Sequence, residues 1–275
     1  MLQTIDTRDA AAVENEVGAI YLALYPEAGP DFVHTAFGWV TDYFLGRNPD
    51  YQAIDAPYHD FEHTMQVTLC MARLLRGLCA SGFDLPVRAF ELGIIAALFH
   101  ETGYLKVRGD TEGTGAKYTA VHVGRGTAFA ESFLPTKGFT AAEVRAVHNM
   151  IYCTCVSTDA RTIPFQSELE RTAGYALGTS DLLAQMAASD YVEKLPLLYQ
   201  EFAEAAQNAP AEKAHLFAFK SADDLIRNSP AFWEGYVLPR VRGEFRGMYK
   251  FLADPYPDGS NDYLQRIEAN IARLR

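Results

Sequence analysis

The chain of 275 residues has 35 acidic and 24 basic side chains, a formal net charge of −11 at pH 7. This charge argues against a broad surface for nucleic acid or anionic lipid, so we expect no nucleic-acid duplex and no membrane as a partner. Four cysteines are too few for a disulfide scaffold, and neither a signal-like apolar core nor a run of about 18 apolar residues is present. We therefore expect a cytoplasmic protein.

Apolar residues recur at three- and four-residue steps almost throughout, as in amphipathic helices. This period predicts helices over residues 13–24, 31–46, 59–78, 85–101, 118–134, 190–206, 229–252 and 260–274. Two more helices are expected to begin at Thr140 and Ser167, where Thr140–Glu143 and Ser167–Glu170 fit a capping box. We expect a kink or a break at Pro196, because proline cannot donate a helical hydrogen bond. With no alternating strand pair, the sequence predicts an all-α fold in one domain.

Six ionisable side chains lie in stretches that otherwise read as core. They are His63, His100, Glu101, His122, His148 and Asp181. Burying such groups among Leu, Ile and Met costs several kcal/mol unless they are paired or bind a metal. A hydrogen bond would explain one such residue, but six in one chain point to a shared site. Imidazole with carboxylate suits one or two divalent metal ions, with Fe, Mn, Zn, Ni, Co and Mg all left open.

The order His … His-acid … His … His … Asp resembles the HD superfamily of metal-dependent phosphohydrolases, with His100-Glu101 in place of the hallmark His-Asp pair. "YHDFEHTMQVTLCMARLL" is similar to the signature helix of the 3′,5′-cyclic nucleotide phosphodiesterases, "TSDLLAQM" to their Asp-Leu-Ser-Ala segment, and "SPAFWEGYVLPRV" to the helix that lines their base pocket. The resemblance implies a compact helical HD-domain bundle. Within the single domain of residues 1–275, residues 56–275 would form the metal-binding core, and residues 1–50 lie outside the resemblance.

The resemblance also implies residue roles at the metal. His63, His100, Glu101 and Asp181 match the ligands of the first metal, and Glu101 would bridge two ions that activate a water. His59 matches the histidine that protonates the leaving oxygen. In the pair His59 and His63, His63 would thus bind the metal and His59 would donate the proton.

Other matches and departures bear on the substrate and on a second metal. Tyr58 and Phe232 would contact the substrate, Phe232 as the aromatic that clamps the base. Ser229 stands where the family has a glutamine that binds a purine, and Tyr104 replaces a further histidine. His122 and His148 look like the two extra histidines of members that hold a second metal, a group that includes phosphodiesterases and di-iron oxygenases.

The function expected is a metal-dependent phosphodiesterase that acts on a cyclic nucleotide or another small phosphodiester through metal-activated hydroxide. Two alternatives stay open: an HD-type di-iron oxygenase acting on a small hydroxylated or phosphonate substrate, and an inactive metal-stabilised binding or sensor module. The aromatic-rich first 50 residues would either cap the pocket or form the face of a homodimer.

Overall fold

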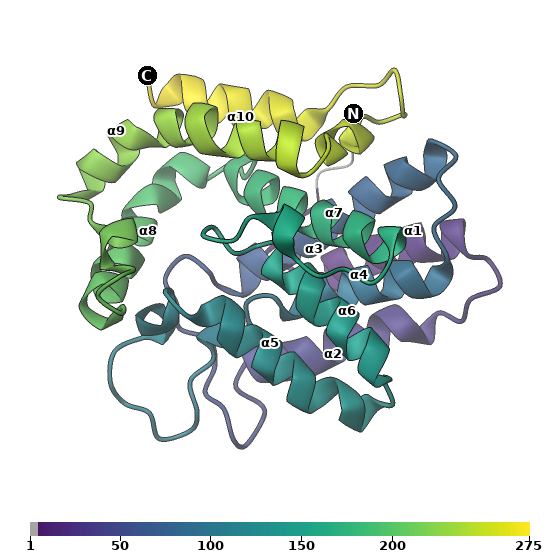
Figure 1. The fold of residues 1–275 in the computed structure, drawn as a ribbon, viewed down its shortest axis with the longest axis horizontal. Helices are drawn as coiled ribbons and strands as arrows, with labels where there is room; N and C mark the ends of the chain where they lie inside the picture. Colours follow the sequence, from purple (N-terminus) through teal and green to yellow (C-terminus); the bar gives the residue numbers. More distant parts are fainter. Residues whose placement is uncertain (1–4) are drawn as a thin grey trace.

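The computed structural model describes residues 5–275, so the first four residues of the predicted domain lie outside the described part. Over that range the chain is helical, apart from loops and the two isolated β-bridges Tyr51–Val107 and Asp254–Ser260 (Figure 1). The all-α prediction is confirmed. The α-helices are α1 (Ala10–Leu24), α2 (Asp31–Phe44), α3 (Phe61–Ala80), α4 (Val87–Phe99), α5 (His122–Phe133), α6 (Ala141–Tyr152), α7 (Glu168–Met186), α8 (Tyr191–Asn208), α9 (Ala222–Phe232) and α10 (Asp262–Arg273).

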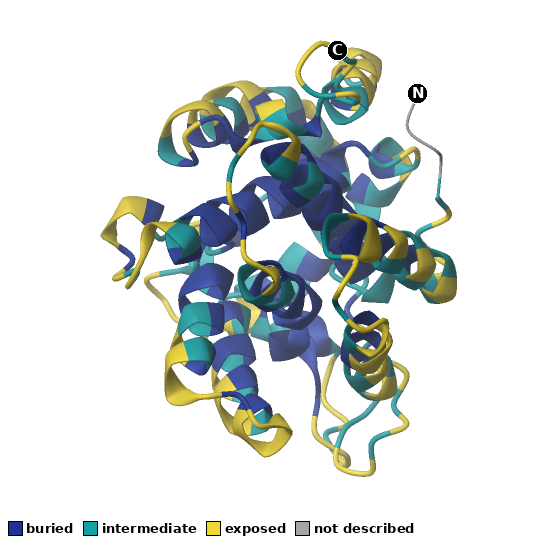
Figure 2. Ribbon diagram, turned by 90° about the vertical axis from the view of Figure 1, so that its right-hand side faces the viewer, coloured by how far each residue is buried: buried dark blue, intermediate teal, exposed yellow. Residues whose placement is uncertain are grey.

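Two helices, α3 and α7, pack against each other at the centre of the molecule. Every residue from His63 to Leu75 and from Thr172 to Ala184 is buried. Figure 2 shows the buried residues gathered toward the middle of the molecule, with exposed residues on the outer turns and loops. The sequence predicted one apolar stripe on α3, but α1, α4 and α7 cover it from several sides. Any charged group within these two buried stretches must therefore find a partner inside the protein.

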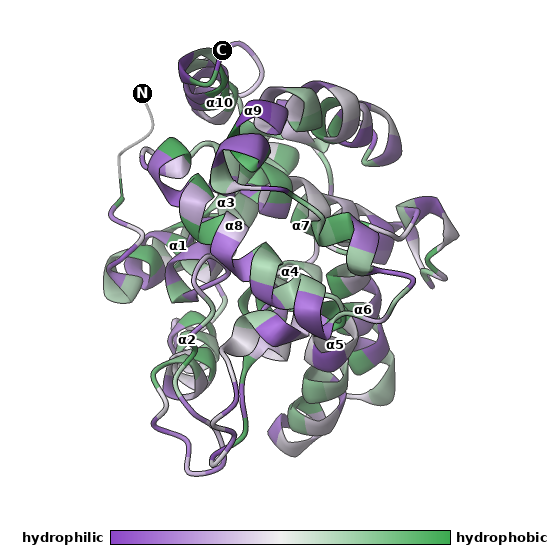
Figure 3. Ribbon diagram, turned by 90° about the vertical axis from the view of Figure 1, so that its left-hand side faces the viewer, coloured by the Kyte–Doolittle hydropathy of each residue, from purple (hydrophilic) through white to green (hydrophobic). Residues whose placement is uncertain are grey.

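The two N-terminal helices extend the same core. α1 packs on α3 and α2 packs on α4, and Val17, Phe37 and Phe44 are at most 1% exposed. The outer helices carry hydrophobic and hydrophilic residues around their circumference, as amphipathic helices do (Figure 3). Among the described residues, no helix is both long and apolar enough to cross a bilayer.

Several boundaries differ from the prediction. The capping box at Thr140 is present, and Ser167 caps α7, but the Glu170 carboxylate accepts from the Gln166 N–H at 2.8 Å instead of returning to Ser167. The expected break at Pro196 is absent, because α8 continues through it.

The expected helix over 229–252 is divided. α9 ends at Phe232 and is followed by the π-helical segments Trp233–Val237 and Arg240–Glu244 and the 3₁₀ helix Met248–Leu252. The helical period shows that this region is helical, but it does not distinguish α from the wider π and the tighter 3₁₀ turns.

Candidate metal centre

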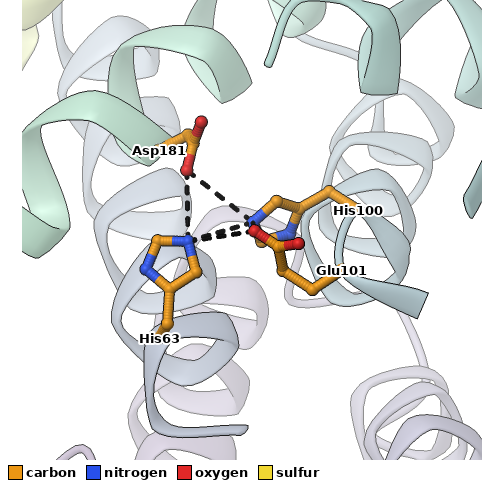
Figure 4. Close-up of side chains that lie close together, drawn as sticks. All are labelled: His63, His100, Glu101 and Asp181. Atoms are coloured by element: carbon orange, nitrogen blue, oxygen red, sulfur yellow. Dashed lines mark hydrogen bonds and ion pairs between the residues drawn. The ribbon is translucent and has the colours of Figure 1, made fainter. Parts of the chain in front are cut away.

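Four of the six predicted ligands converge in the core. His63 lies in the first turn of α3, His100 directly follows α4, Glu101 follows it, and Asp181 lies on α7. Their ligand atoms all lie within 4.8 Å of one another. Figure 4 shows the side chains meeting from three sides.

His63 is at the middle of this group. Its Nε2 lies 3.4 Å from Nε2 of His100, 3.3 Å from Oε1 of Glu101 and 3.2 Å from Oδ1 of Asp181. The Asp60 carboxylate caps α3 by accepting the His63 N–H at 2.9 Å. This cap fixes where α3 begins and places His63 in its first turn.

Two backbone hydrogen bonds orient the neighbouring imidazoles. Nδ1 of His100 lies 2.6 Å from the Ala97 carbonyl, and Nδ1 of His122 lies 2.7 Å from the Thr119 carbonyl. A carbonyl only accepts, so Nδ1 carries the proton in both rings and the neutral ring keeps its lone pair on Nε2. His122 Nε2 lies 3.9 Å from Oε2 of Glu101, which places His122 on the other side of that carboxylate.

The donor set and its burial fit a divalent metal ion. The side chains of His63, His100 and Glu101 are at most 2% exposed and that of Asp181 is 12% exposed. Oε2 of Glu101 and Nδ1 of His63 have no hydrogen-bond partner among the described residues. Two buried carboxylates are costly without compensating positive charge, and imidazole with carboxylate is a ligand set for first-row divalent ions. The group could therefore hold a metal ion.

The pKa values of His63 and Glu101 also show that the two carboxylates favour a positive charge between them. Burial lowers the pKa of His63, but hydrogen bonds and charges from Asp181 and Glu101 outweigh burial and raise that pKa to about 10. Burial opposes ionisation of Glu101, yet the charge and hydrogen bond of His100, with further contributions from His59 and His63, hold the Glu101 pKa well below its usual value. A bound metal ion would replace the proton of His63 as the cation between the two carboxylates.

His59 lies beside the group and pairs with an acid that the sequence analysis missed. Oε1 of Glu201, on α8, contacts Nδ1 of His59, and Oε2 accepts the backbone N–H groups of Tyr58 at 3.0 Å and His59 at 3.1 Å. Glu201 is fully buried. On the acid-rich helix α8, nothing in the sequence separates Glu201 from Glu204, so only the fold identifies it.

Tyr104 lies between His59 and His122. Its ring stacks on the ring of His59, with 5.3 Å between the centroids and 8° between the planes. It also stacks on the ring of His122, with 4.7 Å between the centroids and 26° between the planes. Its hydroxyl is 3.3 Å from Nδ1 of His59. The residue that the resemblance marked as a departure is thus fully buried and in contact with both histidines.

Gly103 allows this close packing. A Cβ there would lie 1.9 Å from the backbone oxygen of His122, so the turn before Tyr104 can approach the start of α5 only without a side chain.

The structure does not bring His148 to the group, which corrects the prediction of that residue as a ligand. Its Nδ1 lies 2.5 Å from Oε1 of Glu131, and its side chain is 30% exposed. Its neighbours Val147, Asn149 and Met150 on α6 are buried, whereas His148 turns toward Glu131 on α5. The sequence period alone did not separate these neighbouring positions.

The predicted substrate residues lie in different settings. The Tyr58 hydroxyl is buried and donates to Oε1 of Gln185 at 3.1 Å. Ser229 is buried, and its hydroxyl donates to the Leu225 carbonyl at 3.0 Å. Phe232 is 44% exposed and stacks on Tyr236 with 5.0 Å between ring centroids. Their contact with a substrate stays a prediction.

The fold and the site together define an all-helical protein with a buried candidate metal centre of two histidines and two carboxylates. The family model described as Npun_R2479-like matches residues 11–250, and the chain belongs to that family. A comparison with curated proteins found no match. The family description names no activity.

Proposed function

We propose that the protein is a metal-dependent phosphohydrolase that cleaves a small phosphodiester. The observation that carries the proposal is a paired, protonatable histidine, His59, beside a buried group that fits a divalent ion. A bound metal ion supplies an activated water at neutral pH and neutralises charge on the phosphate oxygens. The resemblance to HD phosphohydrolases supports the same reading.

His59 is the proton donor in this proposal. Burial lowers its pKa, but the charge of Glu201, the charge of Glu101 and the hydrogen bond to Glu201 together raise that pKa above the ordinary value of 6.5. The raised pKa favours the protonated ring, which gives a proton to the departing oxygen. Glu201 holds the Nδ1 edge, which leaves Nε2 for the substrate.

The exposure of the side chains supports approach of the substrate from one side. His59, His122 and Asp181 have side chains that are 16%, 19% and 12% exposed, whereas those of His63, His100 and Glu101 are at most 2% exposed. The substrate then meets the group on the side where His59 stands.

The alternatives have less support. The oxygenase reading depended on the pair His122 and His148, and His148 pairs with Glu131 at the surface instead. The Ser229 hydroxyl is already donated to a backbone carbonyl, which favours a substrate without purine-specific hydrogen bonds. We also propose a cytoplasmic location, consistent with four cysteines that are all free. A homodimer stays open.

The proposal is tested by turnover of bis-p-nitrophenyl phosphate and of a dialkyl phosphodiester with Mn²⁺ or Zn²⁺ added to the apoprotein. We expect metal-dependent turnover of both. His59→Ala should slow the alkyl ester by about 10²- to 10⁴-fold, and the p-nitrophenyl ester less, because p-nitrophenolate leaves without a proton. Metal binding without turnover would favour the sensor module, and equal effects on both esters would remove His59 as the acid.

A further inference from the structure

His63 is one of the residues that line a small pocket, and the other three ligands are not among its walls. Its volume is about 10 Å³, and its walls include Tyr58, His63, Gln66, Gln185 and Lys194. Figure 4 shows one ring nitrogen of His63 directed at the group and the other directed away from it. The second nitrogen is Nδ1, which is buried and has no hydrogen-bond partner among the described residues.

The pocket has room for one water molecule, and several of its wall residues carry polar groups. A buried water requires a cavity of roughly 10–15 Å³ and about two to four polar partners. A buried N–H without a hydrogen-bond partner is costly, so a partner for Nδ1 stabilises the folded state.

The walls offer suitable acceptors and a donor. Gln185 is fixed, because its Nε2 donates to the Asp181 carbonyl at 3.1 Å and its Oε1 accepts from Tyr58 at 3.1 Å. The Gln66 amide nitrogen faces Oε1 of Glu62 at 3.4 Å, which turns its oxygen the other way. Lys194 donates to Oε2 of Glu62 at 2.7 Å and has two further N–H protons.

From this arrangement we infer that the pocket is a binding site for one ordered water, which accepts the Nδ1–H of His63 and donates to Gln66 and Gln185. Lys194 supplies a further N–H. The role of this water at a metal ligand rests on the proposed function, because that function supplies the metal. The water keeps the proton on Nδ1, so Nε2 presents its lone pair to the ion. Gln66 is thereby a positioning residue for the metal ligand.

The first test uses metal-free protein labelled with ¹⁵N-histidine. We expect a slowly exchanging Hδ1 signal for His63 with a cross-peak to bound water. Gln66→Met, which keeps the volume and removes the acceptor, should weaken or abolish that cross-peak. Thr68→Val is the control, because the Thr68 hydroxyl is buried on the same helix and donates to the Thr64 carbonyl at 2.8 Å, outside the pocket. A cross-peak unchanged in Gln66→Met would overturn the inference.

The second test is Zn²⁺ affinity. Gln66→Met should lower it by about 10- to 100-fold, the usual cost of losing an outer partner of a ligand histidine. Gln66→Glu, which restores an acceptor, should keep the affinity of the unmodified protein. If Gln66→Met fails to fold, Lys194→Met tests the same water from the opposite wall. Failure of the unmodified protein to bind Zn²⁺ would end the metal proposal alone, because the cross-peak in the metal-free protein still decides on the water.

Discussion

Glu201 and His59, 142 positions apart in the chain, form a buried pair that joins α8 to the start of α3. The carboxylate holds both the imidazole and the backbone N–H groups of Tyr58 and His59. It therefore fixes the position of the ring as well as its charge. This contact links the proposed proton donor to a residue outside the candidate metal centre.

Glu201→Gln should lower the pKa of His59 and reduce the stability of the protein. The raised pKa of His59 contributes stability that is present below 6.5 and is lost as pH rises through the folded value. The lowered pKa of Glu201 contributes stability that is present above 4.5 and is lost as pH falls through the folded value. The loss in Glu201→Gln should thus be greatest between those two pH values, of the order of 3 kcal/mol.

NMR titration of His59 and urea unfolding across pH check this prediction. The matched control is Glu204→Gln on the same helix, where the carboxylate accepts from Thr114 N at 2.6 Å and from Thr114 Oγ1 at 2.7 Å. The control should leave the His59 titration unchanged. Equal shifts in both variants would mean that Glu201 acts only through the packing of α8.

His63→Ala should abolish stoichiometric metal binding, whereas His148→Ala should not alter it. His63 Nε2 contacts all three other ligand atoms, but His148 pairs with Glu131 at the surface. The loss of affinity in His63→Ala should exceed the roughly 100-fold that an outer partner costs. Elemental analysis and metal titration measure both variants. Retention of metal in His63→Ala would remove the ligand assignment.

Metal binding should release a proton from His63. Its pKa in the metal-free protein is about 10, so the ring must lose one proton before Nε2 can bind an ion at neutral pH. The apparent affinity for Zn²⁺ should therefore rise by about tenfold per pH unit between pH 7 and 9. Calorimetry in buffers of different ionisation enthalpy counts the protons released. An affinity that does not change over this range would contradict the prediction.

The raised pKa of His63 also makes the stability of the metal-free protein depend on pH. Because it is raised, His63 contributes stability that is fully present below 6.5 and is lost as pH rises toward about 10. Metal-free protein should then lose stability in this range, and bound metal should restore it. Thermal unfolding with and without Zn²⁺ at pH 7 and pH 9 measures the difference.

Gly103→Ala should displace the start of α5 and destabilise the protein by about 1–3 kcal/mol or more. The added Cβ would meet the His122 carbonyl oxygen at 1.9 Å and the Gly126 nitrogen at 2.8 Å. Gly124→Ala is the control on α5, because nothing lies within 4 Å of its added Cβ. The control should stabilise the helix by about 0.5–1 kcal/mol. Urea unfolding and the His122 NMR signals distinguish the two outcomes.

The sequence by itself determined the helical class and pointed to the four residues that meet in the candidate metal centre. Apolar residues at a helical period require a buried face, and His63, His100, Glu101 and Asp181 stand out because charge in such stretches needs compensation. The capping box at Thr140 was also readable, because its two hydrogen bonds are local.

Only the tertiary structure decided which of the remaining polar residues meet that group. His122 and His148 occupy similar apolar sequence contexts, yet one faces Glu101 and the other faces Glu131. Glu201 and Glu204 lie on one acid-rich helix, and only Glu201 reaches His59. These differences depend on how helices pack side by side. The period of one helix gives its buried side, but contacts between distant segments follow from the assembled core.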